Sequence, residues 1–187
     1  MKKIETPLEG LFIFEPTIFD DSRGYFYESY NKKKLSELKV NVDFIQDNQS
    51  QSKKGTIRGI HFQTGIFAQS KLVRATQGEI LDVAVDLRPD SETFCEYFSV
   101  ILTAENHRQL FIPKGFGHGF SVLSDTAVLN YKCDNFYDRE SEDGIHPFDS
   151  SLKIDWKVEQ DKAIFSEKDA SLGTFNEFKD KYPRHWW

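Results

Sequence analysis

Residues 71–88, KLVRATQGEILDVAVDLR, hold the most regular pattern in the chain. Every second residue from Leu81 to Leu87 is a large apolar one, and this period of two predicts a half-buried β-strand. The preceding segment, 71–76, has the composition of another strand, and the Gly78 between them is a turn signal. We therefore predict two antiparallel strands joined as a hairpin around residues 77–78.

Short strand-like segments lie on both sides of this centre and are separated by turn residues. Such a series predicts an all-β fold, an antiparallel sandwich or barrel, with a few short helices at its periphery. The further strands are expected at 56–63, 98–102, 109–113, 119–124 and 127–133. Short helices are expected at 31–39 and at 166–175 with Ser166 as N-cap, and a long polar loop at 134–150.

Length and composition limit the classes of function. A chain of 187 residues favours one domain with a substantial core. The net charge of −6 argues against a duplex nucleic-acid binder, which needs a basic excess. The two cysteines form no metal spacing, and no apolar run reaches the roughly 18 residues of a membrane span. The start of the chain is basic but lacks the apolar part of a signal peptide, so we expect a cytoplasmic protein.

The segment TIRGIHFQ, residues 56–63, combines an arginine, a histidine and an amide. His61 can take up a proton near pH 7, although a hydrogen-bonded core histidine is the commoner role for a lone one. Strict alternation places His61 and Gln63 on one face of the strand and Arg58 on the other. Burying Arg58 would be costly unless it met an anion. The sequence leaves open whether a bulge, a twist or a subunit boundary brings Arg58 to the site of His61.

Lys71 and Tyr131 are further candidates from neighbouring strands. A lysine at a strand end is most often solvated, but its point charge can also stabilise an oxyanion. Tyr131 alternates with Leu129 and Cys133, so its phenol could fill space in the core or donate a proton to a substrate.

His118 and Asp169 have two readings each. His118 stands between glycines in GFGHGF, where the backbone can approach closely, but no second histidine lies at a metal-binding spacing. Asp169 follows Ser166 by three residues, which resembles a capping box. It could instead orient a histidine and raise its basicity.

Near the N-terminus, DDSRGYFYESY (20–30) combines Arg23 and Glu28 with aromatic residues, and QDNQS (46–50) adds amides. Taken singly, the two are a charged turn and a polar loop. A nucleotide-sugar pocket would use such parts, with arginine for phosphate, aromatic rings for a base and amides for sugar hydroxyls.

Taken together, these segments resemble the dTDP-4-dehydrorhamnose 3,5-epimerase family. The resemblance rests on seven motifs in family order, from about residue 4 to about residue 170: DSRGYFYESY, QDNQS, TIRGIHFQ, AQSKLVRATQGEILDVAVDLRPDS, FIPKGFGHGF, NYKC and FSEKD. It implies a cupin-type jelly roll over residues 1–187, with 171–187 as a C-terminal extension. It also implies a homodimer that could share its N-terminal strands, and no metal or other cofactor.

The implied reaction inverts C3 and C5 of dTDP-4-dehydro-6-deoxy-D-glucose, on the route to dTDP-L-rhamnose. By resemblance, His61 removes the proton next to the 4-keto group and Asp169 orients it. Lys71 stabilises the enolate, and Tyr131 returns a proton from the opposite face. The same resemblance gives the substrate contacts as Arg23, Phe26, Glu28, Gln46, Asn48, Arg58, Lys71, His118, Glu142 and Lys168.

Two segments depart from the family pattern. TGIFAQS (64–70) replaces an expected proline-containing loop, and the tail LGTFNEFKDKYPRHWW has no counterpart that we can place. A change in the loop could alter which carbon is inverted. One alternative is therefore an epimerase acting at C3 or C5 only. Three others stay open: a 3,4-ketoisomerase, a non-catalytic cupin that binds a sugar nucleotide, and a metal-dependent cupin dioxygenase.

Overall fold

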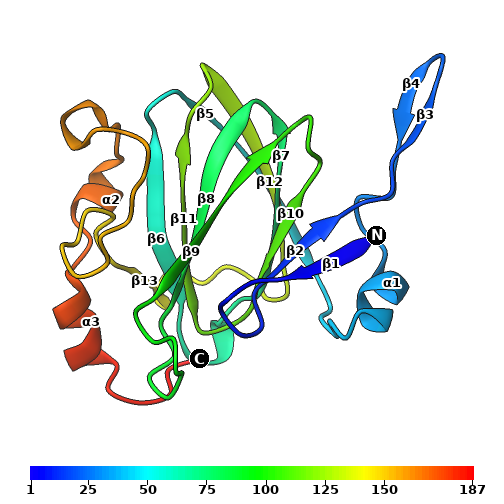
Figure 1. The fold of residues 1–187 in the computed structure, drawn as a ribbon. Coiled ribbons are helices and arrows are strands. Elements are labelled where there is room, and N and C mark those ends of the chain that lie inside the picture. The colour runs from blue at the N-terminus through cyan, green and yellow to red at the C-terminus, as the bar shows by residue number, and fades with distance from the viewer.

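The computed structural model describes residues 1–187 as two antiparallel sheets that face each other, with short helices at the edges (Figure 1). In spatial order, the six-stranded sheet consists of β1 (Lys2–Glu5), β2 (Phe12–Glu15), β10 (Gln109–Ile112), β7 (Lys71–Gln77), β12 (Thr126–Cys133) and β5 (Gln46–Lys53). The five-stranded sheet consists of β13 (Glu142–Gly144), β6 (Ile57–Gln63), β11 (Phe116–Val122), β8 (Glu79–Asp86) and β9 (Tyr97–Thr103). The predicted cupin-type, mainly β fold is confirmed.

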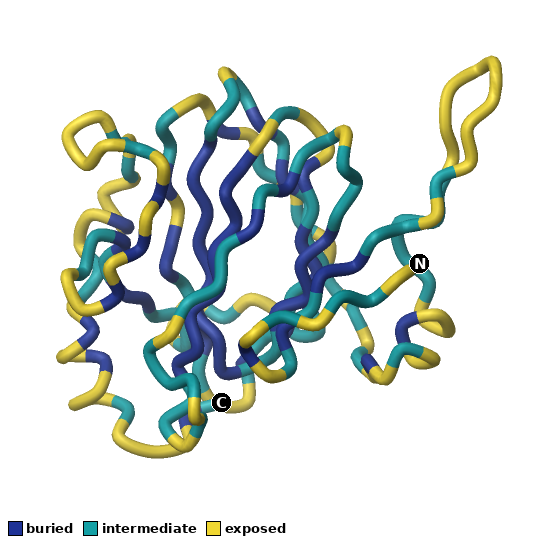
Figure 2. The backbone as a smooth tube through the Cα atoms, in the orientation of Figure 1, coloured by how far each residue is buried: buried dark blue, intermediate teal, exposed yellow.

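The main core fills the space between the two sheets. Val73 and Leu129 project into it from the six-stranded sheet, and Ile80 and Phe120 from the other. Burying an apolar side chain of this size stabilises the fold by about 1.5–3 kcal/mol. Figure 2 shows the buried backbone concentrated in the strands and the exposed backbone in the loops and the projecting hairpin.

Strand β8 is buried on both faces, so the prediction of a half-buried strand was wrong. Val83 and Val85 face away from the core between the sheets and belong to a second apolar cluster with Trp156 and Trp186. The chain after residue 144 covers this outer face, with α2 (Glu167–Ala170) and α3 (Phe175–Lys181) beside the five-stranded sheet (Figure 1). An alternating pattern alone cannot show that a distant segment covers the second face.

The predicted hairpin around residues 77–78 was also wrong. Strands β7 and β8 follow each other in the chain but lie in different sheets, so the chain crosses between the sheets at Gly78. Gly78 has φ +70°, and a Cβ there would lie 2.1 Å from the Thr126 carbonyl oxygen. The glycine is therefore required by a crossing against a neighbouring backbone and not by a hairpin turn.

Helical segments are shorter than the sequence suggests. The 31–39 region forms α1 (Lys32–Glu37), and the 166–175 region forms only α2, capped by Ser166 as predicted. Helix α3 was not predicted, although Thr174 and Glu177 form a complete capping box at its start. The supposed loop 134–150 contains β13, and 3₁₀ turns lie at Gly65–Phe67 and Gln160–Lys162. None of the helices has the length and apolar character that a membrane crossing needs.

A two-stranded hairpin projects away from the body of the molecule near the N-terminus (Figure 1). It consists of β3 (Phe19–Asp21) and β4 (Gly24–Phe26), and all six residues are exposed. The rings of Phe19 and Phe26 pair across it, 6.4 Å apart. Neither ring belongs to an apolar cluster of the core.

Candidate active site

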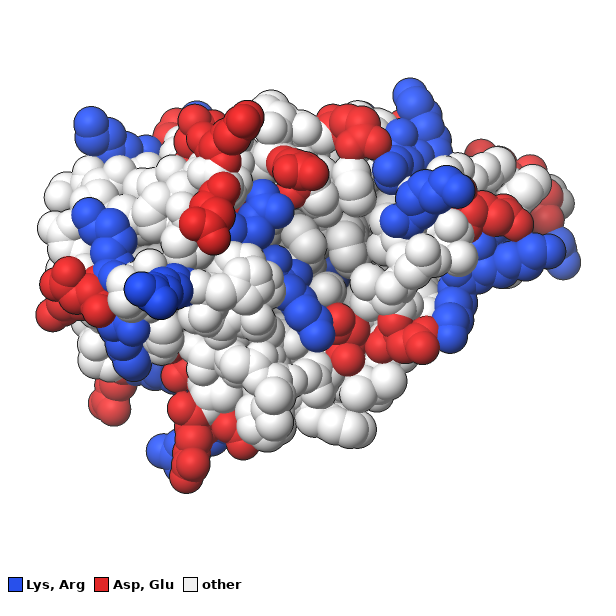
Figure 3. All heavy atoms as spheres, turned by 90° about the horizontal axis from the view of Figure 1, so that it is seen from below, with Lys and Arg blue, Asp and Glu red and all other residues white.

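One cavity of about 440 Å³ opens between the two sheets and is lined mainly by polar side chains. Figure 3, which views the molecule from below, shows a hollow in this face with Lys and Arg side chains near its edge. Most of the predicted site residues line the cavity: Gln46, Asn48, Arg58, His61, Lys71, His118, Tyr131, Glu142, Lys168 and Asp169. Segments far apart in the sequence thus meet in one place.

An irregularity in β6 brings Arg58 to the same cavity as His61. His61 pairs with His118 of β11, but Arg58 pairs with Phe120, so three steps along β6 oppose two along β11. Such a bulge changes the side-chain alternation, and the prediction of opposite faces was wrong for this reason. Gly59 makes the bulge possible, because it has φ +114° and a Cβ there would lie 2.4 Å from the Gly119 Cα.

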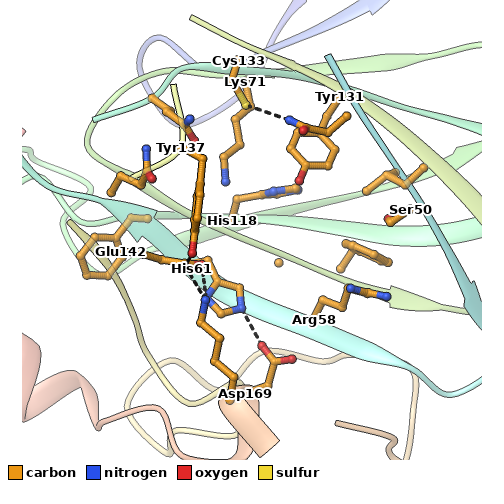
Figure 4. A pocket seen from close by; sticks show the side chains of 18 of the residues that line it. Ser50, Arg58, His61, Lys71, His118, Tyr131, Cys133, Tyr137, Glu142 and Asp169 are labelled. Atoms are coloured by element: carbon orange, nitrogen blue, oxygen red, sulfur yellow. Dashed lines mark hydrogen bonds and ion pairs between the residues drawn. The ribbon is translucent and has the colours of Figure 1, made fainter. Parts of the chain in front are cut away.

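His61 and Asp169 form a tight pair at the centre of the site (Figure 4). The His61 Nε2 lies 2.6 Å from the Asp169 Oδ1, and the Ser166 hydroxyl donates to the Oδ2 over 2.6 Å. The Gly59 amide also donates to the Oδ1. Burial works against ionisation of the carboxyl, but the hydrogen bonds from His61, Ser166 and Gly59 outweigh it and lower the pKa of Asp169 to about 2.

This pairing determines which nitrogen of His61 is available. An ionised carboxylate only accepts hydrogen bonds, so the Nε2 carries the proton and donates it to Asp169. The Nδ1 is then the basic nitrogen, and it is buried without a hydrogen-bond partner. The nearest carboxylate oxygen to it, Glu142 Oε1, is 3.7 Å away. The imidazole is therefore held in place by a hydrogen bond at one nitrogen and has no hydrogen bond at the other.

Lys71 and Tyr131 point into the cavity from β7 and β12 of the opposite sheet (Figure 4). Desolvation lowers the pKa of Lys71, and nearby Cys133 and Glu142 only partly oppose this effect. Burial raises the pKa of Tyr131, so its phenol keeps its proton at neutral pH. The cavity thus presents an imidazole from one sheet, and a phenol and an amine from the other.

A second histidine–carboxylate pair lies beside the first. The His118 Nε2 is 2.7 Å from the Asp82 Oδ1, and both side chains are buried. Asp82 Oδ2 has no hydrogen-bond partner. The alternating pattern of β8 gave no sign of this pair, because Asp82 looked like a solvent-facing residue of a half-buried strand.

Polar residues at the rim form a connected network. Glu142 accepts a hydrogen bond of 2.6 Å from the Tyr137 hydroxyl and forms an ion pair with Lys168. Burial opposes its ionisation, but these two partners bring the pKa of Glu142 below its usual value. Gln46 donates to Asn48 and accepts from the Tyr137 amide, which links the first residues of β5 to the rim.

Several lining residues were missed by sequence reasoning. Tyr137 and Gln69 lie in loops, Ser50 lies in the polar strand β5, and Cys133 looked like a core residue. Gln63, which had no expected role, holds the rim together, since its amide binds Phe67, Phe136 and Asp138 backbone groups. No periodic pattern could have shown Tyr137 and Gln69, because loops carry none.

Three predicted contacts do not reach this cavity in the single chain. Arg23 and Phe26 lie on the projecting hairpin, where Arg23 pairs with Asp21. Glu28 pairs with Lys34 of α1 and accepts a hydrogen bond from Asn31. The N-terminal motif therefore belongs to a different region from the other predicted site residues.

A two-sheet antiparallel fold whose cavity holds an oriented histidine, a protonated phenol and a desolvated lysine defines a cupin-type protein suited to proton transfer on a bound ligand. No group of three or more His, Cys, Asp or Glu side chains is placed to hold a metal ion.

Comparisons with known proteins give the particular family. Residues 5–177 match the model of the dTDP-4-dehydrorhamnose 3,5-epimerase family. The enzyme of that name from Escherichia coli K12 is 48% identical over 178 residues, 95% of this chain and 96% of the relative. The Elizabethkingia anophelis enzyme of that name has a crystal structure with a TM-score of 0.90 and 51% identity, covering 95% of this chain and 97% of that one. A Legionella pneumophila dTDP-6-deoxy-D-glucose-3,5-epimerase in complex with dTDP-4-keto-L-rhamnose gives a TM-score of 0.93, 45% identity and 98% coverage of both chains. The chain belongs to the dTDP-4-dehydrorhamnose 3,5-epimerase family.

Proposed function

We propose that this protein epimerises dTDP-4-dehydro-6-deoxy-D-glucose at C3 and C5 to give dTDP-4-dehydro-L-rhamnose. The observation that carries the proposal is His61, whose Nδ1 has no hydrogen-bond partner and whose side chain lines the cavity that Tyr131 enters from the opposite sheet. Inverting a carbon centre requires removal of a proton on one side and its return on the other. A base and an acid on opposing sheets supply both.

The first step is proton removal. The 4-keto group acidifies the hydrogens on C3 and C5, and His61 takes one of them at Nδ1. The electron pair of the broken C–H bond moves into an enolate, and negative charge develops on the ketone oxygen. Asp169, ionised and fixed by three donors, stabilises the imidazolium that forms. The ammonium of Lys71 stabilises the enolate oxygen, and it does so strongly because it is poorly solvated.

The second step is reprotonation from the other face. Tyr131 donates its phenolic proton to the enolate carbon, which inverts the centre. Burial raises the pKa of this phenol, so the phenol keeps its proton until the enolate forms. His61 then returns its proton to the phenolate through solvent, and the same sequence serves the second carbon. No electron leaves the sugar in either step.

The nucleotide end of the substrate needs cations and polar groups at the edge of the cavity. Arg58 is exposed there and donates to the Ser52 hydroxyl, and Lys168 is half-exposed beside Glu142. We assign these two side chains and His118 to the diphosphate and its neighbourhood. The amides of Gln46 and Asn48 would then bind the sugar or the base.

We also propose that the functional unit is a homodimer, located in the cytoplasm. Arg23 and Phe26 project away from their own chain on an exposed hairpin, so they can reach a cavity only in a second copy. The two cysteines are free thiols, which suits a reducing compartment. A monomer in light scattering at micromolar concentration would contradict the dimer.

The reaction is tested by incubating the protein with the 4-keto sugar nucleotide in heavy water. Deuterium at both C3 and C5 is expected, because both protons exchange through the enzyme's acid and base. Label at one position only would reassign the protein as a single-centre epimerase. A moved carbonyl would identify a ketoisomerase, and binding without any label would identify a non-catalytic sugar-nucleotide protein.

A further inference from the structure

Trp186 forms hydrogen bonds with two segments of the protein that are distant from it in the sequence. Trp186 is buried, and its indole Nε1 donates to the Leu87 carbonyl over 3.0 Å. Its own carbonyl accepts a hydrogen bond of 2.7 Å from the Gly65 amide. Trp186 therefore joins the loop 64–70 to the end of strand β8. The match to the family model ends at residue 177, so this anchor follows the matched segment.

The same segment packs behind the catalytic strand. The ring of Phe62, the neighbour of His61 in β6, lies 4.6 Å from the Trp186 ring and 5.8 Å from the Tyr182 ring. The Tyr182 hydroxyl donates to Asp143 over 2.7 Å. Asp143 pairs with Phe62 across β13 and β6. The tail thus contacts both strands that border the site on this side.

The loop that Trp186 holds is itself joined to the rim of the cavity. Gln69 donates to the Asn135 carbonyl over 2.8 Å, and the Asn135 amide donates back to the Ile66 carbonyl over 2.6 Å. Gln63 bridges the same two loops through the Phe67 and Phe136 carbonyls. The 134–138 loop carries Tyr137, whose hydroxyl binds Glu142 at the rim. Hydrogen bonds, joined by short stretches of backbone, therefore connect Trp186 to Tyr137 and Glu142, which line the cavity.

We propose that Trp186 is a positioning residue that fixes the rim formed by loops 64–70 and 134–138, and so sets the affinity for the sugar nucleotide. The proposal rests on the proposed function for the identity of that ligand. Neither His61 nor Asp169 forms a hydrogen bond with the tail. Loss of the anchor therefore affects substrate binding far more than the proton transfer itself.

The test compares the full chain with a chain that ends at His185. The shortened chain keeps α3 and the Tyr182 contact with Asp143, so the outer apolar cluster stays largely covered. Trp187→Ala is the matched control, because it removes an aromatic residue but none of the hydrogen bonds of Trp186. Trp186→Phe is the rescue variant, which restores an aromatic ring and the main-chain carbonyl without the indole donor.

The shortened chain is expected to raise KM by about tenfold while kcat stays within about twofold, since only binding interactions are weakened. The Kd for dTDP should rise in parallel. Amide hydrogen exchange should speed up at 64–70 and 134–138 but not in β8 or β11. Trp187→Ala should match the full chain, and Trp186→Phe should recover most of the KM.

Two results would overturn the proposal. One is an unchanged KM and dTDP affinity with faster exchange throughout the protein, which would make the tail a stabilising element only. The other is unchanged exchange at the two rim loops. The exchange and dTDP measurements do not require turnover, so they decide the role of Trp186 even if the full chain fails to epimerise the proposed sugar.

Discussion

Two histidine–carboxylate pairs lie side by side at the cavity, with nearly equal lengths but different surroundings. His61 and His118 are directly opposite each other on β6 and β11, and their distances to a carboxylate are 2.6 Å and 2.7 Å. The first carboxylate is Asp169, which comes from the distant helix α2. The second is Asp82, which comes from the adjacent strand β8.

The two pairs differ in the hydrogen bonds to the carboxylate and in the exposure of the histidine. Both oxygens of Asp169 accept hydrogen bonds, whereas one oxygen of Asp82 has no partner. The His61 side chain is 21% exposed to the cavity and the His118 side chain only 8%. A short distance between imidazole and carboxylate therefore does not identify a base. The proposal that His61 is the base rests instead on its fully hydrogen-bonded carboxylate and on the ring nitrogen that has no partner.

The largest effect is expected from removing the imidazole of the first pair. His61→Ala should slow deuterium entry at C3 and C5 by about a thousandfold, since general base catalysis contributes rate factors of this order. Exchange is measured by NMR of the sugar nucleotide after incubation in heavy water. The fold should survive, because His61 lies in the cavity and not in an apolar cluster.

His118→Ala is the matched control for this change. It also removes an imidazole from the cavity, but we assign His118 to substrate binding. Its KM should rise, and deuterium entry at saturating substrate should fall by no more than about tenfold. Equal losses in the two variants would remove the distinction between the pairs.

The next effect concerns the carboxylates. Asp169→Asn should lower kcat by about a hundredfold with little change in KM, because an amide cannot stabilise the imidazolium and can hold the wrong tautomer. Asp82→Asn should lower kcat much less than Asp169→Asn does. Steady-state kinetics of both variants decides the point, and a larger kcat loss for Asp82→Asn would make His118 the base.

The pKa of Asp169 leads to a third prediction, on stability against pH. A folded pKa of about 2, below the ordinary 3.8, means that ionised Asp169 stabilises the fold by about 2 kcal/mol. This contribution is complete above about pH 4 and is lost as the pH falls toward 2. Urea unfolding should therefore show that the difference in unfolding free energy between the wild type and Asp169→Asn narrows as the pH falls over this range. A difference in unfolding free energy that does not vary with pH would show that folding does not lower the pKa of Asp169.

The contrast between the two pairs also explains what the sequence could predict. Four residues could be proposed as catalytic from the sequence, because each lies in a motif of the family and could be given a chemical role: His61, Lys71, Tyr131 and Asp169. Most strands were predicted because apolar alternation is local. The pairing of Asp82 with His118 was not predicted. Strand β8, which carries Asp82, is buried on both faces, and alternation cannot show what covers the second face.

Other features depend on contacts that no local pattern encodes. The bulge that brings Arg58 to the cavity depends on the close approach of Gly59 to Gly119 in the next strand. Strand β5 has polar residues throughout, since Gln46, Asn48 and Ser50 line the cavity and the residues between them are exposed, and so it lacks an apolar period. Tyr137 reaches the rim because Gln46 and Gln63 hold its loop.

The smallest effect would come from making the first pair more like the second. The Ser166 hydroxyl donates to Asp169 Oδ2 and accepts from the Asp169 amide as the N-cap of α2. Ser166→Ala leaves that oxygen without its partner, as in Asp82, while His61 stays in contact. Loss of one hydrogen bond should lower kcat by about threefold to tenfold, and loss of the cap should cost about 1 kcal/mol of stability.

The same substitution should raise the pKa of Asp169, because one of the groups that stabilise its charge is gone. The stability gap relative to Asp169→Asn should then shrink and close at a higher pH than in the wild type. Ser166→Thr keeps a hydroxyl and can still cap the helix, so it should restore both kcat and the pH dependence. If Ser166→Ala lowered stability but left kcat and the pH dependence unchanged, Ser166 would be a helix cap alone. The orientation of His61 would then depend only on Asp169 and the Gly59 amide.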